Sequence, residues 1–163
     1  QQLTGIRAVA DEIVDTSDMT VHELRQVFMA VSRGRSRAGL IVNVMSFGYK
    51  HGVPVDADLV FDVRCLPNPY FVPGLKRRTG RDAAIVRFME RDESTRTFIA
   101  RLEDYVRFLL PYYVQEGKSY LTIAIGCTGG RHRSVMIAER VRRAVDGTDG
   151  VRVRLRHRDV RRA

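Results

Sequence analysis

Apolar residues recur along this chain with two different periods, which predict strands that alternate with helices. Runs rich in β-branched residues predict strands at residues 40–47, 59–63, 120–125 and 151–155. Apolar positions three and four residues apart predict helices at about 93–114 and 135–147, and a shorter strand or helix at 83–88. This alternation favours an α/β fold with a mostly parallel sheet and flanking helices.

Two proline-containing segments affect the connections between these elements. Pro67-Asn68-Pro69-Tyr70 predicts a rigid turn, because each proline fixes its own φ and restricts the residue before it. Pro111 falls inside the longest predicted helix and is expected to kink or end it. The apolar face predicted for that helix consists of Phe98, Leu102, Val106, Leu109 and Tyr113.

Residues 1–33 do not join this pattern, and we expect them to be the tail of an upstream domain plus a linker. A helix is predicted over residues 21–31, with an N-cap at Thr16, Ser17 or Asp18. The segment 32–37 is polar and contains a glycine, which is typical of a linker. The chain also begins without a methionine, so we expect a fragment whose second domain covers residues 38–163.

The composition is that of a globular domain without membrane spans or a disulfide framework. Hydrophobic residues make up 44% of the 163 residues, which is enough for a core. No apolar run reaches the roughly 18 residues of a membrane span. The two cysteines, Cys65 and Cys127, lie in or beside strand-like segments. We therefore expect a cytoplasmic protein with no membrane partner, and no cysteine–histidine spacing predicts a metal site.

Positive charge is concentrated near the C-terminal end. Of a formal net charge of +9, residues 131–163 carry +7, because eleven arginines there stand against four acids. This asymmetry favours a polyanionic partner, with nucleic acid the first candidate. The alternative is a protein that uses arginine on every solvated surface. Alternate arginines along and beyond the last predicted strand are expected to share one face: Arg152, Arg154, Arg156 and Arg158.

The main chemical feature is the loop that joins the strongest predicted strand to the next helix. A helix N-terminus presents unsatisfied N–H groups and a dipole that favours negative charge. Paired glycines let the backbone approach an oxyanion closely, and neighbouring hydroxyls and cations can bind it. A phosphate site is therefore predicted at Thr128, Gly129, Gly130, Arg131, His132, Arg133 and Ser134. The alternative is a tight turn whose arginines are only solvated.

The same loop matches the Cys-x5-Arg spacing of cysteine-dependent phosphatases. In those enzymes the loop amides and the arginine hold the phosphate while a thiolate attacks phosphorus, and here Cys127 and Arg133 occupy these positions. Three features count against this reading. Gly126 stands where those enzymes usually have His, no Trp exists for a Trp-Pro-Asp loop, and Asp62 is the only acid expected at a suitable strand end. We favour the alternative that Cys127 is a small, buried, unreactive residue.

Polar residues also follow two other predicted strands. In a parallel sheet these strand ends meet the glycine loop at one edge, where α/β proteins bind ligands. Their mixture of polar groups with an aromatic ring suits a sugar. We expect ligand contacts from Asn68 and Tyr70, with Lys50, His51 and Arg64 as additional candidates. The alternative for this cluster is that Arg64 pairs internally with Asp62 and that the proline-rich turn is structural.

Several segments together resemble the RapZ/YvcJ family. The most specific is the motif Gly-Cys-Thr-Gly-Gly-x-His-Arg-Ser-Val, and the resemblance covers about residues 40–160. The resembling segments are Ser46–Gly52, Asp56–Asp58, Phe61–Arg64, Leu66–Pro69 and Gly126–Val135. The resemblance implies a domain similar to a phosphofructokinase subdomain, with no catalysis of its own. It also implies an upstream P-loop domain that binds and hydrolyses ATP or GTP; no Gly-x4-Gly-Lys-Ser/Thr is present here, so we expect no cofactor in this segment.

The family resemblance further implies ligands and partners. Its members sense glucosamine 6-phosphate or N-acetylglucosamine 6-phosphate, bind small regulatory RNA, present that RNA to a ribonuclease, and form multimers. The family's sugar-phosphate contacts match Thr128, Gly129, His132 and Arg133, whereas Tyr70 stands where the family has a ligand-contacting His. The family's basic tail corresponds loosely to residues 154–162, which adds Arg161 and Arg162 to the expected RNA contacts.

Overall fold

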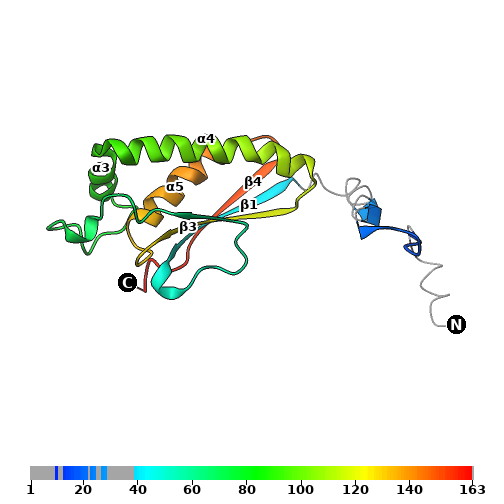
Figure 1. The fold of residues 1–163 in the computed structure, drawn as a ribbon, viewed down its shortest axis with the longest axis horizontal. Coiled ribbons are helices and arrows are strands. Elements are labelled where there is room, and N and C mark those ends of the chain that lie inside the picture. Colours follow the sequence, from blue (N-terminus) through cyan, green and yellow to red (C-terminus); the bar gives the residue numbers. More distant parts are fainter. Residues whose placement is uncertain (1–9, 11–12, 22, 25–26, 29–38, 163) are drawn as a thin grey trace. The chain divides into compact units, whose positions relative to one another are not determined.

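The computed structural model describes residues 10, 13–21, 23–24, 27–28 and 39–162 (Figure 1). The chain divides into two units, Gln1–Ala38 and Gly39–Ala163. The predicted linker at residues 32–37 lies outside the described residues, and the domain boundary predicted there stays a prediction.

In the first unit, a helical segment begins after Thr20 rather than after the predicted cap at residues 16–18. The Thr20 hydroxyl accepts a hydrogen bond from the Glu23 N–H at 3.3 Å, and the Glu23 carboxylate accepts one from the Thr20 N–H at 2.8 Å. This reciprocal pair is a capping box, which needs an acid three residues after the cap. The earlier polar residues form a turn instead, in which Asp15 accepts a hydrogen bond from the Ser17 N–H at 3.0 Å.

The second unit is built on a four-stranded, all-parallel sheet with strand order β2-β3-β1-β4. The strands are β1 Leu40–Gly48, β2 Leu59–Asp62, β3 Tyr120–Cys127 and β4 Val151–His157. Every residue of β3 after Tyr120 is buried, as expected for a central parallel strand. In β4 the exposed residues alternate with partly buried ones, because this edge strand has only one neighbour and one covered face. The predicted parallel α/β class is therefore confirmed.

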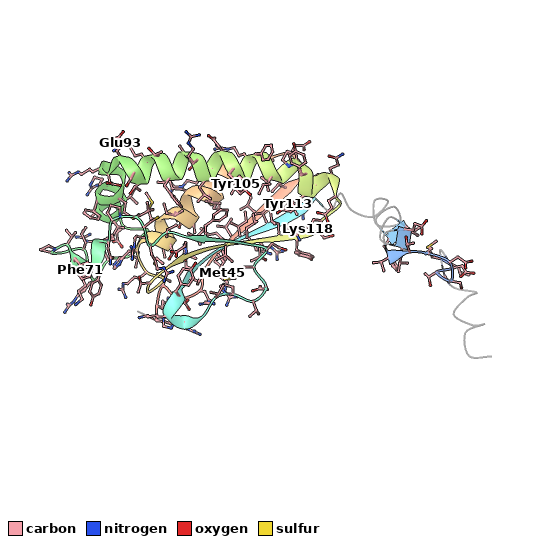
Figure 2. All side chains as sticks on the ribbon, in the orientation of Figure 1. Met45, Phe71, Glu93, Tyr105, Tyr113 and Lys118 are labelled. Atoms are coloured by element: carbon pink, nitrogen blue, oxygen red, sulfur yellow. The ribbon has the colours of Figure 1, made fainter. Side chains whose placement is uncertain are left out.

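The helices α3 Ala83–Arg91, α4 Glu93–Gln115 and α5 Arg133–Val145 all lie on one side of this sheet (Figure 1). Their buried side chains meet those of the strands in one core, which includes Val44, Ile123, Leu110 and Ile137. The opposite side of the sheet carries no α-helix of the described residues. Figure 2 shows Met45 on that side, away from α4.

Helix α4 differs from its prediction in two respects. It continues through Pro111 to Gln115 instead of ending at the proline, and its last turn is closed by the Glu116 N–H, which donates to the Tyr112 carbonyl at 2.9 Å. Its buried residues are Thr95, Ile99, Leu102, Val106 and Leu110, so the core-facing side is rotated slightly from the predicted one. At its start, the Asp92 carboxylate accepts a hydrogen bond from the Thr95 N–H at 2.7 Å, which is a typical N-cap.

None of the described helices combines the length and the apolar composition that crossing a bilayer requires.

Candidate functional site

The glycine loop lies where β3 ends at Cys127 and α5 begins at Arg133. Gly130 has φ +77°, a left-handed conformation that favours glycine. A Cβ at this position would lie 2.7 Å from the Gly48 nitrogen and 2.9 Å from the Asp159 Cβ. Gly129 is different, because its Cβ would meet only the Lys50 side chain at 3.8 Å. Gly130 is thus required by the fold, whereas packing alone does not require Gly129.

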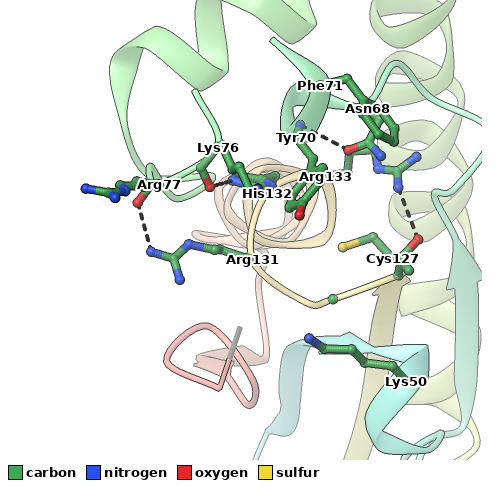
Figure 3. A pocket seen from close by; sticks show the side chains of 12 residues that line it. Lys50, Asn68, Tyr70, Phe71, Lys76, Arg77, Cys127, Arg131, His132 and Arg133 are labelled. Carbon is green, nitrogen blue, oxygen red and sulfur yellow. Dashed lines mark hydrogen bonds between the residues drawn. The ribbon is translucent and has the colours of Figure 1, made fainter. Parts of the chain in front are cut away.

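The end of β1 packs directly against this loop. A Cβ at Gly48 would lie 2.6 Å from the Gly129 carbonyl carbon, so the two backbones are in contact. The Lys50 N–H, in the 3-10 helix η1 Tyr49–His51, donates a hydrogen bond to the Thr128 carbonyl at 3.2 Å. These contacts hold the Lys50 side chain beside the loop (Figure 3).

A cavity of about 590 Å³ opens at this edge of the sheet (Figure 3). This volume is within the range of small-molecule sites, roughly 300–1,000 Å³. Among the described residues its lining contains cationic side chains and no carboxylate. The lining residues are Lys50, Asn68, Tyr70, Phe71, Lys76, Arg77, Cys127, Thr128, Gly129, Arg131, His132 and Arg133.

Helix α5 presents its N-terminus to this cavity. Its N-cap residue is His132, which makes no side-chain capping hydrogen bond. The cap side chain therefore accepts no first-turn N–H, and within this helix start His132 and Arg133 line the cavity, at the positive end of the helix dipole. The predicted order of strand, glycine loop and helix is confirmed, and phosphate binding at this loop stays a prediction.

Arg133 links two strand ends across the cavity. Its Nη1 donates to the Arg64 carbonyl at 2.7 Å and to the Leu66 carbonyl at 3.0 Å, and its Nη2 donates to the Thr128 hydroxyl at 3.3 Å. The side chain is buried, and these bonds use three of the five N–H donors of a guanidinium. Arg133 therefore fixes the cavity wall as well as supplying positive charge.

Arg131 binds the basic segment 76–78 and so holds it at the cavity, although this segment was not predicted to belong to the site. Its guanidinium donates to the Arg77 carbonyl at 2.8 Å and to the Arg78 carbonyl at 3.1 Å, and the Gly80 N–H donates to the Arg131 carbonyl at 2.9 Å. Lys76 and Arg77 thereby line the cavity. The basic run itself is visible in the sequence, but its position depends on these long-range bonds.

His132 is buried against the same segment, with its Nε2 at 3.2 Å from the Lys76 carbonyl oxygen. Burial lowers the pKa of His132, and the charges of Arg131 and Arg133 act in the same direction. The imidazole by itself is therefore neutral at pH 7.

Tyr70 and Asn68 form one wall of the cavity mouth. They belong to the turn around the 3-10 helix η2 Pro69–Phe71, where the Asn68 side chain accepts a hydrogen bond from the Tyr70 N–H at 3.2 Å. The Lys76 ammonium lies 4.6 Å from the centre of the Tyr70 ring, a cation–π contact. The half-exposed Tyr70 ring can stack on a sugar, and the neighbouring Phe71 ring adds a second exposed aromatic surface.

Four of the predicted ligand contacts do not line the cavity. The Arg64 guanidinium lies 2.6 Å from the Asp62 carboxylate and 4.1 Å from the centre of the Tyr49 ring, which is the internal pairing considered above. His51 lies outside the lining as well. Gly130 is buried by its contact with Gly48, and the remaining residue, Ser134, is fully buried with its hydroxyl 3.1 Å from the Cys127 sulfur.

Five of the six predicted RNA contacts are exposed, and the sixth, Arg158, is partly buried. Arg152, Arg154 and Arg156 are exposed along one face of β4, while Arg161 and Arg162 are exposed in the segment that follows. Arg158 differs, because its guanidinium donates to the Asp159 carboxylate at 2.8 Å and to the Gly52 carbonyl at 2.6 Å. The alternation ends with the strand at His157, so Arg158 points back into the protein and not along the exposed face.

The exposed arginines of β4 border the side of the sheet that carries no described α-helix. In the strand register Arg154 is level with Asn43, which in turn is level with Thr122. A hollow of about 500 Å³ lies over these residues and also includes Arg156 and Asp56. This surface combines positive charge with polar side chains at its centre.

Asp159 connects the glycine loop region with the C-terminal arginines. Its buried carboxylate accepts hydrogen bonds from the Gly48 N–H at 2.9 Å and from Arg158 at 2.8 Å, while Arg162 lies 3.7 Å from its other oxygen. Burial alone would raise the pKa of Asp159, but the hydrogen bonds from Arg158 and Gly48 lower it overall. The carboxylate is therefore ionised at neutral pH.

Comparison with known proteins gives consistent matches over this unit. A family model described as the RapZ C-terminal domain matches residues 40–161. A "nucleotide-binding protein" of Acidobacterium capsulatum is 53% identical over 99% of this chain and 53% of that protein. Proteins with the same description from Solibacter usitatus and Geobacter metallireducens are 48% and 46% identical, over 99% and 98% of this chain and 51% and 56% of their own lengths. The chain thus spans about half the length of these curated relatives.

Proposed function

Because the chain belongs to the RapZ C-terminal domain family, we propose that it is a regulatory domain that binds a phosphorylated amino sugar and RNA. The sugar phosphate is of the glucosamine 6-phosphate or N-acetylglucosamine 6-phosphate type, and it is bound rather than turned over. One observation carries the proposal: a cavity of about 590 Å³ whose described lining is cationic, at the N-terminus of a helix without a side-chain cap.

The cavity offers separate surfaces to the two parts of such a ligand. The phosphate would lie at the start of α5, near Thr128, Arg133 and Lys50, where the helix dipole and the cations both attract a dianion. The sugar ring would then face Asn68 and Tyr70 at the mouth, where an amide and an aromatic ring can bind hydroxyls and a flat sugar face.

Calorimetric titration tests the sugar-phosphate site. Glucosamine 6-phosphate and N-acetylglucosamine 6-phosphate should bind, whereas glucosamine without phosphate should bind on the order of 100-fold more weakly, since it lacks the charge-assisted hydrogen bonds. Lys50→Ala should weaken phosphate binding, while Arg143→Ala, an exposed arginine near the other end of α5, should not. Equal affinity for the sugar with and without phosphate would refute the site.

RNA would bind through its phosphates to the exposed arginines of β4 and of the following segment. Arg152, Arg154 and Arg156 lie on one face of the strand, beside a hollow in the sheet surface. Binding of this kind releases counterions, so affinity should fall steeply between about 50 and 200 mM salt. Gel-shift titration of a structured RNA at the two salt concentrations measures this. Affinity that does not change with salt would contradict it.

The whole protein would contain more than this domain. The relatives are described as nucleotide-binding proteins and are about twice as long as this chain. We infer that the parent protein binds ATP or GTP in an upstream P-loop domain, forms homo-oligomers and presents RNA to a ribonuclease. Equilibrium dialysis with labelled ATP and GTP should show binding to the parent protein and none to residues 38–163 alone. Equal binding by the two would place the nucleotide site in this domain.

A further inference from the structure

Cys127 lies at the end of β3 and lines the cavity at the glycine loop. The side chain is buried, yet it forms part of the cavity lining, and in Figure 3 the sulfur points into the curve of the glycine loop. The side chains of Lys50, Arg131 and Arg133 line the same cavity.

A backbone N–H and a hydroxyl group lie within hydrogen-bond distance of this sulfur. The Gly130 N–H donates to it at 3.3 Å, and the Ser134 hydroxyl lies 3.1 Å away. The Gly130 N–H is aimed at the sulfur, so it can hydrogen-bond the negative charge that sulfur carries when it leaves phosphorus. The burial of Ser134 and the left-handed backbone of Gly130 hold both groups in place. The sequence predicted Ser134 only as a phosphate contact, whereas in the structure its hydroxyl lies beside the Cys127 sulfur.

The loop also has the Cys-x5-Arg spacing of a cysteine phosphatase. Arg133 stands six residues after Cys127, and its guanidinium reaches back to the Thr128 hydroxyl, next to the cysteine. We propose that Cys127 is a nucleophile toward phosphorus and that this cavity slowly hydrolyses aryl phosphate monoesters through a phosphocysteine. The inference rests on phosphate binding in the cavity, which is part of the proposed function.

Besides the phosphate ester, water is the one reactant that this reaction needs. The Cys127 thiolate attacks phosphorus, so an S–P bond forms and the ester P–O bond breaks. The electron pair of that bond leaves with the aryl oxygen, which departs as a phenolate and takes a proton from water. Water then attacks phosphorus, an O–P bond replaces the S–P bond, and sulfur leaves as the thiolate. The products are a phenol and inorganic phosphate.

The class of substrate follows from the proton donors near the site. The described lining contains no carboxylate. Asp62 is level with Gly126 in the sheet register, but its hydrogen bonds from Arg64 lower its pKa, so it is ionised and cannot protonate a leaving group. Aryl esters leave without a proton, whereas alkyl esters need one. The amino-sugar phosphate is an alkyl ester and stays intact.

Hydrolysis of para-nitrophenyl phosphate tests the inference. Wild type should release nitrophenolate at a steady rate, and Cys127→Ser, which keeps the volume of the site, should be slower by on the order of 100-fold. Ser134→Ala should be slower by about tenfold, because it removes one donor to the thiolate. Arg143→Ala, on the exposed side of α5, should stay within about twofold of wild type.

Two further measurements separate the possible outcomes. Intact-protein mass spectrometry after an acid quench should find one phosphoryl group on wild type and none on Cys127→Ser. Inorganic phosphate should raise the melting temperature of both proteins, which shows that the variant is folded and that the cavity binds phosphate. If phosphate raises the melting temperature but wild type and Cys127→Ser turn over equally or not at all, this inference is wrong and the binding proposal stands. If phosphate has no effect on either protein, the binding proposal fails as well.

Discussion

The cavity at the glycine loop and the outer face of β4 are both rich in arginine, but they hold their arginines differently. In the cavity, Arg131 and Arg133 each donate to two backbone carbonyls, so their positions are fixed before any ligand arrives. On β4, Arg152, Arg154 and Arg156 are exposed along an edge strand. A fixed set of donors suits one small anion, because little side-chain entropy is lost on binding. Exposed arginines suit a long polyanion whose phosphates need no single arrangement.

The two adjacent glycines of the loop also differ, because the surrounding backbone packs tightly against Gly130 and not against Gly129. Gly130→Ala combines a left-handed φ with contacts under 3 Å to Gly48 and Asp159, so we expect it to lower the free energy of unfolding by about 3 kcal/mol. Gly129→Ala, the matched control, meets only Lys50 at 3.8 Å and should change stability by less than about 0.5 kcal/mol. It should nevertheless weaken phosphate binding, since Gly129 lines the cavity. Urea unfolding and phosphate titration measure both effects, and equal stability of the two variants would contradict the packing described for Gly130.

Asp159 contacts Gly48 beside the glycine loop and Arg158 after β4, so its charge should contribute to the stability of the fold. Asp159→Asn keeps an acceptor for the Gly48 N–H but removes the charge that holds Arg158, which should cost about 2 kcal/mol at pH 7. Because the folded protein lowers the pKa of Asp159, its contribution is present above the ordinary value of 3.8 and is lost as pH falls through the folded value. Urea unfolding measured between pH 7 and pH 3 should therefore show a smaller acid-dependent loss in the variant than in wild type. If the free energy of unfolding depends on pH equally in the variant and in wild type, Asp159 does not contribute to this pH dependence.

Removing the exposed arginines should weaken RNA binding without touching the cavity. For Arg152, Arg154 and Arg156 changed together to Ala, we expect the salt dependence of log affinity to be smaller by about 2, since each phosphate contact contributes roughly 0.7–0.9. Unfolding free energy should stay within about 0.5 kcal/mol of wild type, because these side chains are exposed. Arg158→Ala should behave oppositely, with a loss of stability that accompanies any loss of RNA affinity. RNA titration at several salt concentrations distinguishes the two cases.

His132 gives the smallest expected effect, and it concerns the cavity alone. Its pKa in the folded protein is below the ordinary value of 6.5, so the unfolded chain takes up a proton before the folded one. The free energy of unfolding should therefore decrease as pH falls from 7 through 6.5 toward the folded value. His132→Gln should lack this part of the pH dependence, which urea unfolding between pH 7.5 and pH 5 can detect. A bound dianion should reduce the effect, because it favours the protonated imidazole.

Much of the fold follows from local sequence patterns. The four strands were predicted in place because their buried, β-branched runs are continuous, and the glycine loop was predicted between β3 and α5 because both flanks are strongly patterned. Helix α4 was predicted with nearly correct ends but with a rotated apolar face, since Ile99 and Leu110 are as apolar as the residues chosen in their place. Pro111 was expected to disturb that helix, and the helix nevertheless continues to Gln115.

The sequence by itself determined the α/β class, the order of strand, glycine loop and helix, and the alternation of arginines along β4, because each depends on neighbours close in the chain. Only the tertiary structure decided which cations surround the cavity. Lys76 and Arg77 line it because Arg131 binds the carbonyls of their irregular segment, and no periodicity records that contact. It also decided that Arg158 turns inward to Asp159 and that Ser134 meets the Cys127 sulfur. These contacts join residues whose partners are chosen by burial and hydrogen bonding in the folded chain, which a linear pattern does not encode.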